Sequence, residues 1–147
     1  MNPANTEPLV QEVIVNAPAA RVWKAITDKN DMKQWYFDLE EFRAEPGFEF
    51  QFYGTGSKGE KYLHLCEVKE VIIEKKLSYS WRYDNLPGDS LVTFELFEEE
   101  GKTRVRLTHT GIESFVIDSP DFAKESFAAG WKDIIGTSLK EYVEKVK

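Results

Sequence analysis

The sequence predicts an α+β fold in which a curved antiparallel sheet wraps around a long C-terminal helix. From Ser119 to Val146, large apolar residues recur at helical spacing and form one broad apolar stripe. Upstream of this segment, most stretches alternate apolar and polar residues, which is typical of half-buried strands in an antiparallel sheet. A helix of some 25 residues is about 37 Å long. It therefore needs a wide apolar partner, and the predicted strands can supply one.

The chain begins with one strand and two short helical segments. The first strand is predicted from Leu9 to Asn16, and the Ala17-Pro18 pair ends it. A short helix is predicted from Pro18 to Thr27, and a second one from Asp31 to Tyr36. Val13 and Val15 are expected on the inner face of the strand, and the first helix is expected to bury Val22, Trp23 and Ile26.

The middle of the chain is predicted to form the rest of the sheet. Strands are expected at Phe48–Tyr53, Lys61–Val71, Leu77–Tyr83, Val92–Leu96 and Val105–His109, separated by turns that contain Gly, Pro or charged residues. The inner face is predicted to carry Phe48, Phe50, Phe52, Tyr62, His64, Cys66, Val68, Leu77, Tyr79, Trp81, Tyr83, Val92, Phe94, Leu96, Val105, Leu107 and His109. The sheet would therefore face the long helix with many aromatic rings.

The C-terminal helix has a predicted start and two unusual interior residues. Ser119 is a suitable N-cap, and Pro120 suits the first helical position. Gly130 and Gly136 lie inside the predicted helix, where each costs about 1 kcal/mol relative to Ala. We interpret these glycines as a sign that backbone or a ligand approaches the helix closely.

Length and composition predict one domain, spanning residues 1–147, in a reducing compartment. The net charge of −7 and the lack of Lys/Arg runs argue against nucleic acid or an anionic membrane as a partner. The single cysteine, Cys66, excludes an internal disulfide framework. The N-terminus has no secretory pattern, and no apolar run approaches the ~20 residues of a membrane span. A cytoplasmic location is therefore expected.

Two motifs suggest a cofactor or a metal, but their context predicts neither. Gly54, Gly56 and Gly59 match the G-x-G-x-x-G pattern of dinucleotide-binding proteins. That pattern needs a helix N-terminus directly after it, whereas residues 60–71 alternate like a strand, so a hairpin is expected. His64, Cys66 and His109 have no fourth ligand at a recognisable spacing. The sequence therefore predicts no cofactor and no metal.

His109 and the aromatic residues are the remaining candidates for a site. His109 continues the inward phase of its strand, and no carboxylate in phase with it forms an acid–base pair, so a structural or ligand-orienting role is favoured. The high aromatic content, 14%, fits either a plain core or a cavity between helix and sheet. The two helix glycines and the inward tyrosine hydroxyls favour the cavity.

Several short sequence segments, taken in their order along the chain, resemble the START-like or SRPBCC superfamily. They resemble more closely its branch homologous to the activator of Hsp90 ATPase. They are Ala17-Pro18, Arg21-Val22-Trp23, Ala25-Ile26-Thr27-Asp28, Trp35, Lys76-Leu77-Ser78-Tyr79-Ser80-Trp81, Val92-Thr93-Phe94, Leu107-Thr108-His109-Thr110-Gly111 and Gly130-Trp131. The resemblance implies the helix-grip fold and a hydrophobic cavity between sheet and helix. Members of the superfamily use such cavities for lipids, hormones or polyketides, and some catalyse cyclisation or dehydration there.

Three functions remain open on these grounds. The first is non-enzymatic binding of an apolar or aromatic small molecule or a lipid in the cavity. The second is a co-chaperone-like protein interaction through the outer surface. The third is a cavity enzyme, similar to a cyclase or dehydratase, that uses His109 as acid–base. The predicted ligand-binding residues are Trp35, Phe52, Tyr62, His64, Trp81, Tyr83, His109, Phe127 and Trp131.

Overall fold

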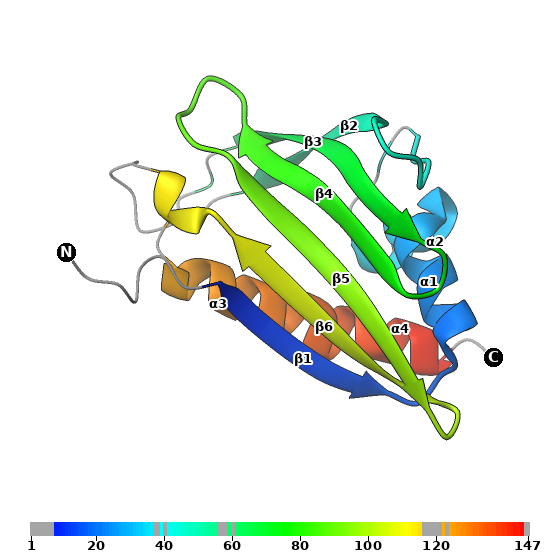
Figure 1. Cartoon of the computed structure of the whole chain (residues 1–147). Helices are drawn as coiled ribbons and strands as arrows, with labels where there is room; N and C mark the ends of the chain where they lie inside the picture. Colours follow the sequence, from blue (N-terminus) through cyan, green and yellow to red (C-terminus); the bar gives the residue numbers. More distant parts are fainter. Residues whose placement is uncertain are drawn as a thin grey trace.

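The computed structural model describes residues 8–36, 39, 41–55, 59, 61–115, 122 and 124–145. Six strands form one antiparallel sheet in the order β1-β6-β5-β4-β3-β2. The strands are β1 (Leu9–Val15), β2 (Glu49–Thr55), β3 (Lys61–Ile72), β4 (Lys76–Tyr83), β5 (Ser90–Glu99) and β6 (Lys102–Thr110). The sheet curves, and the C-terminal helix crosses one of its faces (Figure 1). The predicted α+β helix-grip fold is confirmed.

The inner face of the sheet follows the predicted alternation. Along β4, Leu77, Tyr79, Trp81 and Tyr83 are all buried. In β5 and β6, Phe94 pairs with Leu107 and Val92 pairs with His109, so these buried residues lie side by side across the strands. The hairpin between the two strands turns at Glu100 and Gly101, whose φ angles are 54° and 79°. Two successive positive φ values match the right-handed twist of the flanking strands.

Two short helices, α1 (Ala19–Thr27) and α2 (Lys29–Trp35), follow β1. The second helix starts two residues before the predicted Asp31, because the Asp28 carboxylate accepts hydrogen bonds from the backbone N–H groups of Asn30 and Asp31. Trp23 was predicted to be buried, and this is wrong in part, since it is only half-buried. Asp31 links three helices, because it pairs with Arg21 at 3.4 Å and accepts a hydrogen bond from Tyr142 Oη at 2.9 Å.

The C-terminal helix is not the single α-helix that the sequence predicted. It consists of α3 (Lys124–Asp133), a π-helical segment η4 (Ile134–Leu139) and α4 (Lys140–Lys145). The predicted cap at residues 119 and 120 lies outside the described residues. A 3₁₀ turn, η2 (Ile112–Ser114), follows β6. None of the helices in the described ranges is long and apolar enough to cross a membrane.

The spacing of the buried residues explains the π-helical segment. Trp131, Ile135, Leu139 and Val143 are all buried and recur at steps of four residues. In an α-helix of about 3.6 residues per turn, each such step rotates the side chain by about 40°, so three steps would turn Val143 away from the sheet. A π-helix closes i→i+5 bonds and therefore turns less per residue. The wider turn keeps all four side chains facing inward.

The interpretation of the helix glycines is wrong where it invokes a close approach of backbone. A Cβ atom added at Gly130 or at Gly136 would meet no atom from outside the helix within 4 Å. Gly130 is also exposed to solvent. Neither glycine therefore marks a close approach of backbone, and the approach of a ligand stays a prediction.

Candidate functional site

The fold brings the predicted site residues together between the sheet and α3. They come from α2, β2, β3, β4, β6 and α3, which meet on the concave face of the sheet. Seven are buried, namely Trp35, Phe52, His64, Trp81, Tyr83, His109 and Trp131, while Tyr62 and Phe127 are half-buried. Their role in binding a ligand stays a prediction.

The site residues touch one another through their rings. Trp81 lies at the centre, with ring-centroid distances of 5.2 Å to Trp131, 5.7 Å to Phe52 and 4.9 Å to His64. Most of the pairs are edge-to-face, the arrangement that aromatic quadrupoles favour. The remaining site residues join through His109–Phe127, Tyr62–Tyr83 and the stack of Trp35 on Tyr36. The interior is therefore a continuous set of aromatic rings.

A chain of hydrogen bonds runs through these rings at His109. The Trp131 indole Nε1–H donates to His109 Nδ1 at 3.0 Å, and His109 Nε2 lies 2.8 Å from Ser90 Oγ. Ser90 Oγ donates in turn to the carbonyl of Trp81 at 2.7 Å. Because indole N–H can only donate, Nδ1 must be the unprotonated nitrogen, and Nε2–H then donates to Ser90. Every polar atom of the chain is thus satisfied by one tautomer.

This arrangement makes His109 a poor acid–base group. Burial lowers its pKa to about 3, so the imidazole is neutral at physiological pH. A general base accepts a proton at its unprotonated nitrogen, but His109 Nδ1 already accepts the hydrogen bond of the Trp131 indole. The geometry therefore does not support the cavity enzyme that uses His109.

A second polar group in the interior was missing from the predicted site. The hydroxyls of Tyr36 and Tyr79 lie 2.6 Å apart, and the Tyr36 ring lies 6.1 Å from Phe52 and 6.4 Å from Trp131. Burial raises the pKa of both phenols, so both stay protonated. Each hydroxyl can therefore donate one hydrogen bond and accept others. Tyr79 has the inward phase of its strand, whereas the position of Tyr36 at the end of α2 gave no periodic signal.

His64 is held by packing and by the backbone. Its ring stacks on Phe52 at 4.6 Å, and its Nδ1–H donates to the carbonyl of Tyr62 at 3.0 Å. Burial lowers its pKa to about 4. Gly54 makes room for this ring, since a Cβ there would lie 2.6 Å from His64 Cε1. Gly54 therefore serves the packing of the imidazole.

The remaining sequence motifs can be judged in the described part of the chain. The strand predicted after the glycine pattern is confirmed, because β3 begins at Lys61, and Gly59 has a φ of 83°. Gly56 lies outside the described residues. Within the described ranges, no three His, Cys, Asp or Glu side chains are grouped so that they could hold a metal ion. Burial raises the pKa of the Cys66 thiol, which makes it unreactive.

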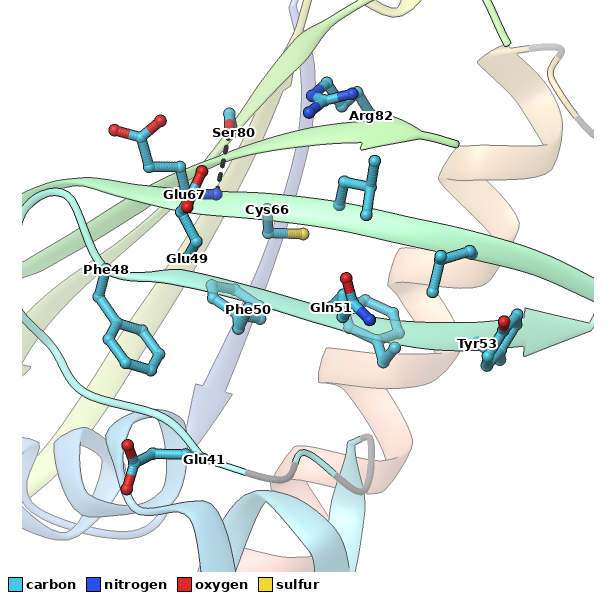
Figure 2. A pocket seen from close by; sticks show the side chains of 13 residues that line it. Glu41, Phe48, Glu49, Phe50, Gln51, Tyr53, Cys66, Glu67, Ser80 and Arg82 are labelled. Carbon is cyan, nitrogen blue, oxygen red and sulfur yellow. Dashed lines mark hydrogen bonds between the residues drawn. The ribbon is translucent and has the colours of Figure 1, made fainter. Parts of the chain in front are cut away.

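A separate hollow of about 830 Å³ lies at the β2 edge of the sheet. Each residue from Phe48 to Tyr53 lines it, together with outward-facing residues of β3 and β4 such as Leu65 and Arg82. Figure 2 shows Phe48 and Phe50 projecting from β2 toward the segment that carries Glu41. Successive side chains of a strand point to opposite faces of the sheet, so residues of both faces of β2 line the hollow. The hollow therefore runs along the free edge of β2.

Solved structures with the same fold come from several bacteria. Protein MLL2253 from Mesorhizobium loti is 23% identical with a TM-score of 0.75, over 96% of this chain and 99% of that one. Protein BH1534 from Bacillus halodurans is 28% identical with a TM-score of 0.72, over 94% of this chain and 97% of that one. DynU16, from the dynemicin biosynthetic locus, is 23% identical with a TM-score of 0.76. The match covers 95% of this chain but only 48% of DynU16.

The family follows from a match over most of the sequence. A search of curated proteins finds no significant match. The family described as "Activator of Hsp90 ATPase homolog 1-like protein" matches residues 16–144, which include both short helices, β2 to β6 and nearly all of the C-terminal helix. With its START-like fold, this chain belongs to the family of activator of Hsp90 ATPase homolog 1-like proteins.

Proposed function

We propose that this protein binds an apolar or aromatic small molecule, or a lipid, between the sheet and α3, without catalysing a reaction. The observation that carries the proposal is the hydroxyl pair of the half-buried Tyr36 and the buried Tyr79, 2.6 Å apart among aromatic rings. A plain core has no need of two phenols there, because phenylalanine fills similar space without a polar atom. Small-molecule sites combine apolar walls with a few converging polar groups.

The hydroxyl pair can serve a ligand. A phenolic hydroxyl both donates and accepts hydrogen bonds, so the Tyr79 hydroxyl can turn toward an acceptor on the bound molecule. The chain of Trp131, His109 and Ser90 is instead fully satisfied and forms a fixed wall. The rings around both groups contact each other, so binding requires them to move apart by changes of rotamer. A ligand is expected to gain roughly 25 cal/mol for each Å² of apolar surface that it buries.

Titration with fatty acids and planar aromatic compounds tests this proposal. Three of the four tryptophans, Trp35, Trp81 and Trp131, are buried in the interior, so their fluorescence should report binding. For ligands with an acceptor group, Tyr79→Phe should weaken binding roughly fivefold, the equivalent of about 1 kcal/mol for a neutral hydrogen bond.

Gly130→Leu is the matched control for the same titration. Gly130 is exposed and has open space beside it, so the leucine should leave ligand affinity unchanged. The absence of a saturable signal with every compound would contradict the proposal. Equal losses of affinity in the tyrosine and glycine variants would contradict it as well, because they would place the ligand outside the interior.

A second candidate is binding to a chaperone of the Hsp90 class, which the family description suggests. It is supported by apolar side chains on the outer face of the sheet, where Val10 is 51% exposed, Ile14 59% and Phe97 38%. Arg104 lies over the Phe97 ring at 4.5 Å, which gives this surface a mixed apolar and cationic character. Phenylalanine and arginine are both enriched at protein interfaces.

The ATPase rate of a bacterial Hsp90 homologue, measured with and without this protein, tests the second candidate. A stimulation that Ile14→Asp abolishes would support it. Ile72→Asp is the control, since Ile72 is 45% exposed but lies on β3, four strands away from β1 in the sheet order. An unchanged rate, or one that both variants reduce alike, would contradict binding through the outer face of β1.

A further inference from the structure

The two edges of the sheet differ in how their backbone groups are covered. At the β1 edge, Lys140 Nζ donates to the carbonyl of Ile14 at 3.1 Å, and the N–H of Asn16 donates to Glu144 Oε2 at 2.7 Å. Side chains of α4 therefore close that edge. The β2 edge has no such cover in the described part of the chain, and the hollow of about 830 Å³ follows it instead. An open strand edge is a template for pairing with another chain.

The register of the sheet identifies the backbone groups that the β2 edge exposes. The carbonyl of Phe48 accepts a hydrogen bond from Val68 N and so points toward β3. By alternation, the backbone groups of Phe50 and Phe52 point the same way. The N–H and C=O groups of Glu49, Gln51 and Tyr53 therefore point away from the sheet. Among the described contacts, these three N–H and three C=O groups have no hydrogen-bond partner.

The sequence of this edge is self-complementary about Gln51. In an antiparallel pair of two copies centred there, Gln51 faces Gln51 of the other copy, and Glu49 faces Tyr53 on both sides. Three residues on each copy then exchange N–H···O=C bonds, so six hydrogen bonds satisfy all the exposed backbone groups. On the outer face, the two amides can bond each other, and each tyrosine hydroxyl can donate to a glutamate carboxylate.

The composition of β2 lacks the usual protection of an edge. Natural edges carry lysine, proline or inward-pointing charges, whereas β2 reads Glu-Phe-Gln-Phe-Tyr-Gly-Thr, with one charge. We propose that β2 pairs with β2 of a second copy around a two-fold axis at Gln51, joining two six-stranded sheets into one. The pairing surface is small, and each copy carries a net charge of −7, so the dimer forms in the micromolar range and tightens when salt screens the repulsion.

Sedimentation equilibrium of the full chain, from micromolar to near-millimolar concentration at about 0.3 M salt, tests the pairing. The mass should rise from 17.0 kDa toward twice that value. Gln51→Pro removes an outward N–H without breaking a bond within the sheet, so it should raise the dissociation constant at least tenfold. Val10→Pro makes the same change at the covered β1 edge and should leave the dissociation constant unchanged.

Two results of this experiment would overturn the proposal. One is a mass that stays at 17.0 kDa over the whole concentration range. The other is a dimer that Gln51→Pro does not weaken, because it would lie on another surface. Should the proline variant fail to fold, hydrogen exchange of the unaltered chain decides. The amides of Glu49, Gln51 and Tyr53 should become protected as concentration rises, and rapid exchange at every concentration would refute the pairing.

Discussion

Trp131→Phe should both destabilise the protein and release the tautomer of His109. The indole N–H is the donor that keeps His109 Nδ1 unprotonated, at 3.0 Å. Without it, a buried acceptor is left unsatisfied, which costs about 1–3 kcal/mol. The smaller ring also leaves a void beside Trp81, whose ring centroid lies 5.2 Å away. We expect a total loss of about 2–4 kcal/mol, a large share of the ~5–15 kcal/mol of a typical domain.

The imidazole cannot avoid this loss by changing its tautomer. If Nδ1 took the proton, Nε2 would have to accept from Ser90, and Ser90 would then no longer donate to the Trp81 carbonyl. One hydrogen bond is therefore lost in either tautomer. Trp23→Phe is the matched control. Because Trp23 is only half-buried, this substitution should lower the free energy of unfolding by less than about 1 kcal/mol.

Urea unfolding gives the free energies, and long-range ¹H–¹⁵N NMR spectra identify which ring nitrogen carries the proton. The unaltered protein should show His109 neutral and protonated at Nε2, and the Trp131→Phe variant should show a mixture of tautomers. A loss below about 0.5 kcal/mol with the tautomer unchanged would refute the idea that the indole holds the imidazole in place. A protonated His109 at pH 6 in the unaltered protein would refute it too.

The remaining predictions concern pH and two glycines. Burial lowers the pKa of His64 to about 4 and that of His109 to about 3, whereas a histidine in the unfolded chain has a pKa near 6.5. Between these pH values the unfolded chain therefore binds more protons than the folded one. Stability should be greatest above pH 6.5 and fall by about 2 kcal/mol for each histidine at pH 5, measured by urea unfolding; a flat profile would contradict this. Gly54→Ala should cost about 1–3 kcal/mol, because its Cβ would meet the His64 ring at 2.6 Å. Gly130→Ala should stabilise by up to about 1 kcal/mol, and a loss in thermal unfolding would show a contact at that site.

Much of the fold was predictable because period-two alternation is a direct consequence of strand geometry. The inner faces of β4, β5 and β6 were identified residue by residue, and His109 was placed on the inner face by its phase alone. Ser90 could have been found by the same rule, because it shares the phase of Val92 and Phe94 on β5. It was missed because a serine beside a turn reads as part of the turn.

Other features depend on contacts that no local pattern encodes. A glycine in a helix signals a close approach only if an added Cβ would meet something, and at Gly130 it would meet nothing. The role of Tyr36 depends on Tyr79, which lies 43 residues away in the sequence and reaches it only through the packing of α2 on the sheet. The open edge of β2 likewise follows from the strand order, which alternation along one strand does not specify.

The π-helical segment η4 behaves like one inserted residue in an otherwise ordinary helix. Deleting the exposed Thr137 would change the steps between Trp131, Ile135, Leu139 and Val143 from four-four-four to four-three-four. That is the spacing of a regular amphipathic α-helix. The shortened chain should therefore fold with a continuous α-helix that keeps the same side chains on the sheet. Relatives without the π-turn should align with this protein through a one-residue gap between residues 134 and 139.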